Sequence, residues 1–278
     1  MKAFTVDLKT EYSFLQGGKL QCILMDNPWA PPAGQNWKRP AVVVIPGGGY
    51  THVSGREGEP IATYFLAKGF QVFVLTYLIK SDGVRYPEQL LEAASAVDYV
   101  RKNAEEFRIN PNEVFVIGFS AGGHLTANLA VEYQNIEKKA GVALQCKPTA
   151  VGLGYPVISK NHGHQGSYES ILNGYSEEEK TELLKTLNLN EAVSEETPPA
   201  FIWATAKDTT VPPDNAIRYA MALDQRGIDY ELHIYPRCRH GKSTGSLEIN
   251  DWEDGTERLN HWMDDCIAFF RLYVEEKF

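Results

Sequence analysis

The stretch from 114 to 126, Val-Phe-Val-Ile-Gly-Phe-Ser-Ala-Gly-Gly-His-Leu-Thr, decides the fold of this protein. Its apolar first half predicts a strand that is buried on both faces, and its second half, from Ala121 onward, predicts a helix. The junction matches the G-x-S-x-G motif, in which a sharp strand-to-helix turn exposes the serine hydroxyl. Gly118 and Gly122, two positions either side of the serine, let the strand and the helix approach closely. The motif therefore predicts that Ser120 is a nucleophile and that the Ala121 amide stabilises an oxyanion.

Strands and helices alternate along most of the chain on either side of this stretch. The predicted strands are Ala41–Ile45, Phe70–Thr76, Glu113–Gly118, Ala150–Gly154, Ala200–Ala206 and Tyr230–Tyr235. The predicted helices are Glu57–Ala67, Pro87–Glu105, Ala121–Tyr133, Pro213–Arg226 and Thr256–Val274. Such alternation predicts an α/β fold with a mostly parallel central sheet and helices on both faces.

Three segments depart from the alternation. Phe4–Leu8 and Leu20–Met25 predict an N-terminal antiparallel hairpin, and Asn27–Pro40 predicts a loop rich in Pro, Gly and Trp. The polar segment Ser159–Glu196 contains a helical stretch, Glu177–Leu187, and stands between two predicted strands. We therefore expect a single domain over residues 1–278, with a short cap-like insertion over the edge where the strands end.

A glycine loop directly follows the first predicted parallel strand, in the sequence Pro46-Gly-Gly-Gly-Tyr50. Glycines free the backbone to turn its N–H groups into a site without Cβ atoms blocking a ligand. We expect Gly48 and Gly49 to join Ala121 in an oxyanion hole. A phosphate-binding loop is excluded because no Lys-Ser/Thr pair follows these glycines.

A serine hydroxyl near neutral pH needs a base, and the base needs an orienting carboxylate. With this nucleophile motif the acid and then the base follow the serine along the chain. Asp208 comes directly after a predicted strand, whereas Asp214 opens the next predicted helix, where a carboxylate complements the helix dipole. We therefore assign the acid to Asp208.

The base is assigned by the positions of the later histidines. His240 lies in a loop just past the last predicted strand, whereas His233 lies inside a strand and His261 inside a helix. His124, on the helix behind Ser120, is interpreted either as a packing residue or as one that supports the reacting side chains from behind. Three aromatic residues in loops at the same edge are predicted to wall a small acyl pocket: Tyr50, Tyr77 and Tyr155.

The composition limits the class of protein. The 278 residues carry a net charge of -9, which argues against a nucleic-acid surface, since such a surface needs a basic stripe. No apolar run approaches the ~18 residues of a membrane span, and the first residues lack the apolar core of a signal peptide. Four scattered cysteines form no CxxC pair and predict free thiols in a reducing compartment: Cys22, Cys146, Cys238 and Cys266. We therefore expect a cytoplasmic protein that binds neither nucleic acid nor membrane.

With these residues placed, the chain resembles the bacterial esterase family of α/β hydrolases that includes acetyl-xylan and feruloyl-type carbohydrate esterases. It is also similar to the small carboxylesterases of lactic-acid bacteria. The resemblance runs from about Ala41 to the C-terminus. It rests on five motifs, Pro46-Gly-Gly-Gly-Tyr50, Tyr86-Pro87, Gly118-Phe-Ser-Ala-Gly-Gly-His124, Asp208-x-x-Val211-Pro212 and His240-Gly241.

The resemblance implies hydrolysis of short acyl esters, often acetyl groups on sugars, with no metal or organic cofactor and a small ester as the partner molecule. The broader lipase relatives carry His-Gly-Gly-Gly where this chain has Pro46, so their substrate range is not carried over. Two other functions stay open at this point, a non-catalytic binding protein and a peptidase on the same fold. Whether the chain forms a homo-oligomer is also open.

Overall fold

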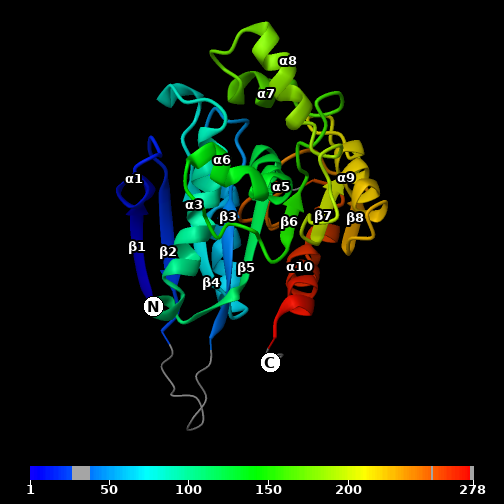
Figure 1. The fold of residues 1–278 in the computed structure, drawn as a ribbon. Coiled ribbons are helices and arrows are strands. Elements are labelled where there is room, and N and C mark those ends of the chain that lie inside the picture. The colour runs from blue at the N-terminus through cyan, green and yellow to red at the C-terminus, as the bar shows by residue number, and fades with distance from the viewer. Residues whose placement is uncertain (27–37, 252, 276–278) are drawn as a thin grey trace.

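The computed structural model describes residues 1–26, 38–251 and 253–275. Within these ranges, eight strands form one sheet in the order β1-β2-β4-β3-β5-β6-β7-β8 (Figure 1). β1 and β2 pair antiparallel, β2 pairs antiparallel with β4, and every other neighbouring pair is parallel. The strands are β1 (Lys2–Asp7), β2 (Lys19–Leu24), β3 (Arg39–Ile45), β4 (Gln71–Thr76), β5 (Ile109–Phe119), β6 (Val151–Gly154), β7 (Ala200–Thr205) and β8 (Tyr230–Tyr235). The prediction of a mostly parallel sheet with an antiparallel N-terminal hairpin is confirmed.

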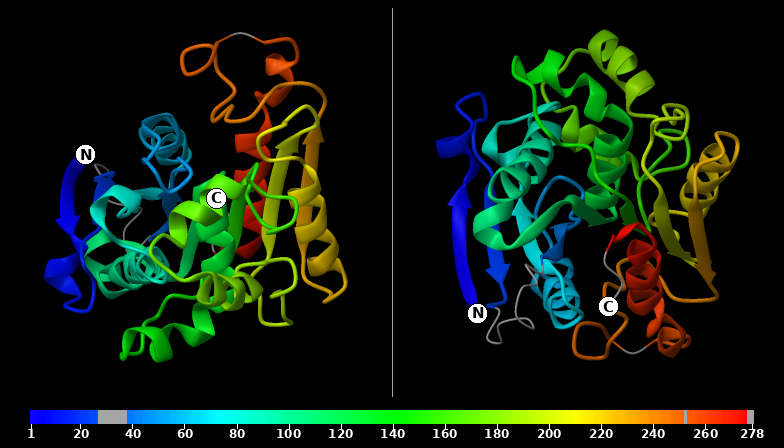
Figure 2. Two further views of the ribbon diagram at one scale, coloured as in Figure 1. Left: turned by 90° about the horizontal axis from the view of Figure 1, so that it is seen from above. Right: turned by 60° about the horizontal axis from the view of Figure 1, so that its bottom comes forward.

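Helices cover both faces of the sheet (Figure 2). Side chains of α3, α5 and α9 pack into one hydrophobic cluster, and those of α2 and α10 pack into a second cluster on the opposite face. The α-helices are α1 (Leu8–Glu11), α2 (Glu59–Ala67), α3 (Glu88–Lys102), α4 (Ala104–Phe107), α5 (Ala121–Glu132), α6 (Ile136–Ala140), α7 (Gln165–Ile171), α8 (Glu177–Thr186), α9 (Asp214–Asp224) and α10 (Trp262–Phe270). The short 3₁₀ turns are η1 (Gly55–Glu57), η2 (Lys80–Asp82), η3 (Tyr133–Asn135), η4 (Thr256–Leu259) and η5 (Arg271–Tyr273).

The central strands show why an apolar run without polar alternation gives a buried parallel strand. In β3, Val43 packs into the cluster under α3 and α5, whereas Val42 and Val44 pack into the cluster under α2 and α10. In β5, Val116 and Phe115 divide between the same two clusters. Successive strand residues point to opposite faces, so a strand covered on both faces needs apolar side chains at every position.

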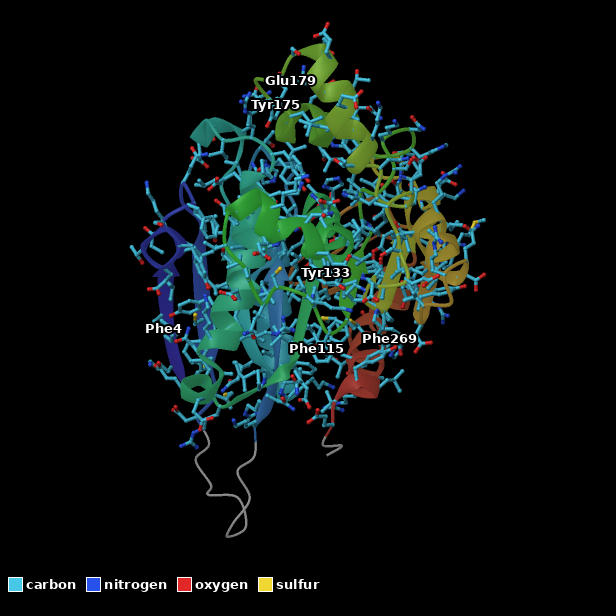
Figure 3. All side chains as sticks on the ribbon, in the orientation of Figure 1. Phe4, Phe115, Tyr133, Tyr175, Glu179 and Phe269 are labelled. Atoms are coloured by element: carbon cyan, nitrogen blue, oxygen red, sulfur yellow. The ribbon has the colours of Figure 1, made fainter. Side chains whose placement is uncertain are left out.

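The parallel strands all end at one edge of the sheet, and α7 and α8 lie beyond that edge (Figure 1). Figure 3 shows Tyr175 and Glu179 in this outer segment, well away from Phe115 in β5. The segment connects β6 to β7, which is where the polar insertion is predicted. Its helix α7 was not predicted, because the sequence of that helix is short and rich in Gly, Ser and Gln.

Several predicted boundaries are wrong, and β5, for example, begins at Ile109 rather than at Glu113. The long C-terminal helix predicted over Thr256–Val274 is divided into η4, α10 and η5, with a break at Asn260 and His261. The break coincides with a tertiary contact, since the indole N–H of Trp262, the first residue of α10, donates to the Ser243 carbonyl at 3.0 Å. The predicted helix 87–105 likewise ends early, at Lys102, and a separate turn, α4, follows. The predicted loop 27–40 lies mostly outside the described residues.

A buried carboxylate on α3 makes the stability of this fold dependent on pH. The Glu92 side chain is fully buried, and its Oε2 accepts a hydrogen bond from the Leu78 amide at 2.9 Å. Burial raises the pKa of Glu92 from 4.5 to about 8, against the effect of that amide. Between these two values the folded protein holds a proton that the unfolded chain has lost, so stability falls as the pH rises.

We therefore expect the stability of a Glu92→Gln variant to increase relative to that of the wild type as the pH rises from 5 to 8. The difference in free energy of unfolding is expected to grow by up to about 1.4 kcal/mol per pH unit, because glutamine has no proton to lose. Urea unfolding of both proteins at pH 5, 6, 7 and 8 measures this difference. Glu105→Gln, at an exposed carboxylate paired with Lys38, is the control and should show a flat difference. A flat difference for Glu92→Gln as well would contradict the assignment.

Candidate active site

Ser120 lies at the turn between β5 and α5. Its backbone has φ 53° and ψ -118°, a strained conformation for a residue with a side chain. The flanking glycines allow the turn, because a Cβ on Gly118 would lie 2.2 Å from the Gly122 carbonyl oxygen and a Cβ on Gly122 would lie 2.1 Å from that of Ile45. Strand β5, helix α5 and the end of β3 are thus in direct backbone contact at the serine.

Three predicted side chains from distant parts of the chain meet at this turn. His240 Nε2 lies 2.8 Å from Ser120 Oγ, and His240 Nδ1 lies 2.5 Å from Asp208 Oδ2. The two ring nitrogens of one imidazole therefore join the hydroxyl to the carboxylate. The arrangement has the hydrogen-bond order of a Ser-His-Asp triad.

Asp208 is held by its own loop after β7. Its Oδ1 accepts hydrogen bonds from the amides of Thr210 at 2.9 Å and Val211 at 2.8 Å, which leaves Oδ2 for the imidazole. Its side chain is fully buried, whereas that of His240 is 18% exposed. The competing Asp214 is the first residue of α9, where its carboxylate pairs with Arg218 at 2.5 Å.

The glycine loop lies against the serine from the β3 side. A Cβ on Gly47 would fall 3.0 Å from Ser120 Cβ, and Gly48 has φ 127°, a value that glycine alone adopts readily. The Gly48 carbonyl accepts from the amides of Thr51 and His52, which closes the loop into a tight turn. Among the described residues, no acceptor is found for the amide N–H groups of Gly48, Gly49 and Ala121. These three amides remain the predicted oxyanion donors.

The three tyrosines predicted to wall an acyl pocket are almost wholly buried, with exposures of 1% for Tyr50, 2% for Tyr77 and 1% for Tyr155. Each phenol group makes a hydrogen bond inside the protein. Tyr50 reaches His124 Nδ1 at 2.7 Å, Tyr77 donates to the Pro46 carbonyl at 2.9 Å, and Tyr155 donates to a carboxylate described below. Their contact with a ligand stays a prediction, while their support of the loops is visible.

The remaining histidines make structural contacts. Burial lowers the pKa of His124 to about 4, so its ring stays neutral at the Tyr50 hydroxyl. His233 pairs with Glu231 on β8 at 2.6 Å, and His261 stands at the N-cap position of α10 without a side-chain capping bond. His162 pairs with Asp214 at the surface. In the described part of the chain, no group of three His, Cys, Asp or Glu side chains is placed to hold a metal ion.

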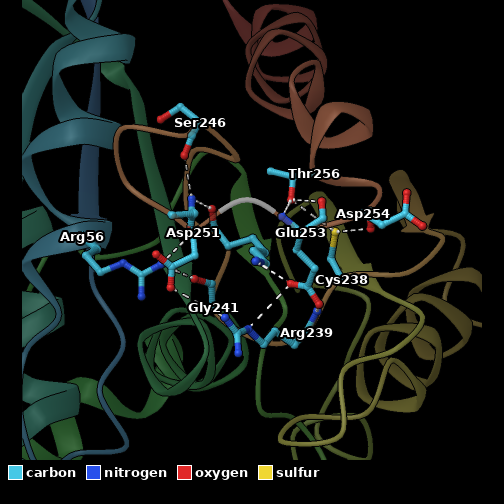
Figure 4. Close-up of polar contacts among 11 residues, drawn as sticks. Arg56, Cys238, Arg239, Gly241, Ser246, Asp251, Glu253, Asp254 and Thr256 are labelled. Carbon is cyan, nitrogen blue, oxygen red and sulfur yellow. Dashed lines mark hydrogen bonds and ion pairs between the residues drawn. The ribbon is translucent and has the colours of Figure 1, made fainter.

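The loop that carries His240 is fixed by polar contacts (Figure 4). Glu253 accepts from the Arg239 amide at 3.1 Å and pairs with the almost buried Lys242 at 2.5 Å. Cys238 lies inside the loop, and burial raises the pKa of its thiol, which disfavours the reactive thiolate. All four cysteines are buried and unpaired.

Sequence reasoning missed Arg56 and Glu57. The Arg56 guanidinium donates to the carbonyl of Gly241, the residue after His240, at 3.0 Å (Figure 4). The buried Glu57 carboxylate accepts from the Gly47 amide at 2.8 Å and from the Tyr155 hydroxyl at 2.7 Å. No local pattern could have identified either residue, because their partners lie about 10 to 185 positions away along the chain.

The sheet order and the strand–serine–helix turn define an α/β hydrolase. Residues 29–223 match the family model described as BD-FAE, and the chain belongs to that family. The family resemblance inferred from the sequence motifs is thereby confirmed.

Individual relatives are similar over most of this chain. Endo-1,4-beta-xylanase B of Butyrivibrio fibrisolvens is 32% identical over 81% of the chain and 36% of that protein. Acetylxylan esterase of Xylanibacter ruminicola is 32% identical over 88% of the chain and 47% of that protein. The chain thus spans half or less of these curated relatives.

A solved structure, an acetyl ester-xyloside bifunctional hydrolase from Caldicellulosiruptor lactoaceticus, is 32% identical with a TM-score of 0.77. That match covers 92% of this chain and 88% of the other. Within the described ranges, none of the helices is both long and apolar enough to cross a bilayer.

Proposed function

We propose that this protein is a serine carboxylesterase that hydrolyses short acyl esters through an acyl-enzyme formed on Ser120. One observation carries the proposal, the hydrogen-bonded chain from Ser120 Oγ through His240 to Asp208. The strained backbone at the serine and the available amides of the glycine loop support it.

In the first half of the reaction, His240 Nε2 takes the hydroxyl proton as Ser120 Oγ attacks the ester carbonyl. Asp208 holds the imidazole in the tautomer that presents a free Nε2 and stabilises the imidazolium that forms. The negative charge on the former carbonyl oxygen is accepted by the amides of Gly48, Gly49 and Ala121. The C–O bond then breaks, and the imidazolium returns the proton to the leaving alcohol.

In the second half, a water molecule attacks the acyl-enzyme, and His240 takes its proton. The carboxylic acid leaves, and Ser120 regains its hydrogen. Each half passes through the same oxyanion donors, so their loss slows both steps. One such donor is typically worth about 10²- to 10³-fold in rate.

The substrate class we propose is acetylated sugars, including fragments of acetylated xylan. The support is the similarity to proteins named as an acetylxylan esterase and as an acetyl ester-xyloside hydrolase. We place the alcohol part of the ester under the segment that carries α7, because Ser167 on α7 lies near the glycine loop. A Cβ on Gly49 would lie 3.9 Å from Ser167 Oγ.

The test combines labelling with rates. We expect an organophosphorus serine probe to bind the wild type once per chain, with the label on the peptide that contains Ser120. Among aryl esters from acetate to octanoate, kcat/KM is expected to be highest for the acetate, and acetylated xylo-oligosaccharides are expected to lose acetate. A protein that binds an aryl acetate without hydrolysing it, and that stays unlabelled, would instead be the non-catalytic binding protein.

A further inference from the structure

One buried carboxylate connects two loops of the proposed active site. Glu57, at the end of η1, is 5% exposed. Its Oε2 accepts from the Gly47 amide at 2.8 Å, and its Oε1 accepts from the Tyr155 hydroxyl at 2.7 Å. Gly47 belongs to the glycine loop after β3, and Tyr155 is the first residue after β6. The two carboxylate oxygens of Glu57 therefore bond to residues that follow two different strands, β3 and β6.

The bond between Glu57 and Tyr155 is part of a longer series of contacts that reaches the loop carrying His240. The Tyr155 oxygen also accepts from the Ser243 amide at 2.9 Å, and its ring lies edge-on to the His240 ring with the centroids 4.9 Å apart. Ser243 Oγ donates in turn to the Arg56 carbonyl at 2.5 Å. The imidazole is thus packed against a ring whose hydroxyl is fixed by Glu57. We call Glu57, Tyr155 and Ser243 the buried link.

The protonation of the Tyr155 hydroxyl decides which groups donate and which accept in the buried link. Burial raises the pKa of Tyr155 well above its usual value, and the neighbouring Glu57 carboxylate raises it further. The phenol therefore stays protonated and donates to Glu57, while its lone pairs accept from Ser243. An apolar side chain in place of Glu57 would leave the Gly47 amide without an acceptor, and the Tyr155 hydroxyl would keep only the bond that it accepts from Ser243.

The geometry of the link bears on the oxyanion site. Because Glu57 occupies the Gly47 N–H, the glycine loop presents the amides of the next two residues, Gly48 and Gly49. Through Tyr155 and Ser243, the same carboxylate connects these donors to the His240 loop. A misplacement of about 1 Å between catalytic groups can cost about 10²-fold in rate.

We infer that Glu57 is a positioning residue for the proposed ester hydrolysis: through Gly47 and Tyr155 it holds the oxyanion loop and the His240 loop at a fixed separation. The inference rests on the proposed function. Glu57 touches no reacting atom, so it acts on the rate through the position of the groups that do.

The main test compares kcat and KM of Glu57→Ala, Glu57→Gln and the wild type on an aryl acetate, with the folded fraction followed by circular dichroism. We expect Glu57→Ala to lower kcat by about 10²-fold with KM nearly unchanged, because the lost alignment matters most in the transition state. Glu57→Gln is expected to recover part of the loss. Its amide oxygen can accept from Gly47 while its NH₂ donates to the Tyr155 oxygen.

Tyr155→Phe and the double variant Glu57→Ala/Tyr155→Phe complete the test. Since the Tyr155 hydroxyl and Glu57 act through one shared hydrogen bond, the double variant is expected to be no slower than Glu57→Ala alone, whereas independent effects would multiply. Glu92→Gln is the matched control, a buried carboxylate that accepts a loop amide away from Ser120. We expect it to keep kcat within about twofold of the wild type, as independent sites do.

Several results would overturn the inference. They are an unchanged kcat in folded Glu57→Ala, multiplicative losses in the double variant, or an equal loss in Glu92→Gln. If Glu57→Ala does not fold, an unchanged kcat in both Glu57→Gln and Tyr155→Phe would overturn it as well. A wild type that hydrolyses no ester would contradict the proposed function itself, which keeps the two failures distinguishable.

Discussion

A Ser120→Ala variant is expected to hydrolyse an aryl acetate about 10⁴- to 10⁶-fold more slowly than the wild type. The methyl group that remains cannot attack the carbonyl, so no acyl-enzyme forms. The oxyanion donors and the imidazole are retained, and they sustain the residual rate over the uncatalysed reaction. Steady-state rates on aryl acetate, with stopped-flow detection of the acyl-enzyme burst, measure the loss.

Ser95→Ala is the matched control for this variant. Ser95 lies on α3 and is fully buried, and its hydroxyl forms no hydrogen bond with the described residues. We expect the control to keep the activity of the wild type, while both variants keep the same circular dichroism spectrum. Hydrolysis retained by well-folded Ser120→Ala would eliminate the serine mechanism.

The second large effect is expected at Asp208, where Asp208→Asn should lower kcat by about 10⁴-fold. An amide at this position can donate to His240 Nδ1, which places the ring proton on Nε2, facing Ser120 Oγ. That tautomer cannot accept the hydroxyl proton. The bonds from Thr210 and Val211 to the remaining oxygen are retained, so we expect the fold to persist.

Asp214→Asn provides the comparison, since Asp214 was the competing acid in the sequence. Its side chain is 40% exposed and pairs with Arg218 and His162, so its replacement should change kcat by less than about twofold. A loss confined to Asp214→Asn would transfer the role of the acid to Asp214. Rates for both variants on one aryl acetate decide between them.

Local sequence predicted which side chains the ends of the strands would bring together. Parallel strands bring their carboxyl ends to one edge, so a serine, an aspartate and a histidine that each follow a strand must lie near one another. The structure places Ser120, Asp208 and His240 within hydrogen-bond distance in this way. The BD-FAE match agrees with the motifs from which the family was inferred.

The tyrosines show what loop position leaves open. Tyr155 is predicted from its loop position to wall an acyl pocket, and this stays a prediction. In the structure its ring contacts those of His240 and Trp203, and its hydroxyl bonds to Glu57. A loop residue in a sequence has no defined direction. Whether its side chain points toward the ligand or toward the core depends on packing from other elements.

By itself, the sequence determined the mostly parallel sheet and the strand–serine–helix turn, and it singled out three side chains that the structure joins by hydrogen bonds. These features follow from local rules, since hydrophobic periodicity and glycine spacing act within a few residues of each other. Only the tertiary structure decided the break before α10 and the contacts of Glu57. Both depend on hydrogen bonds between segments far apart in the chain, such as the bond from Trp262 to Ser243 and the bond from Tyr155 to Glu57. Partners of this kind meet only when the sheet has assembled, so no local pattern encodes them.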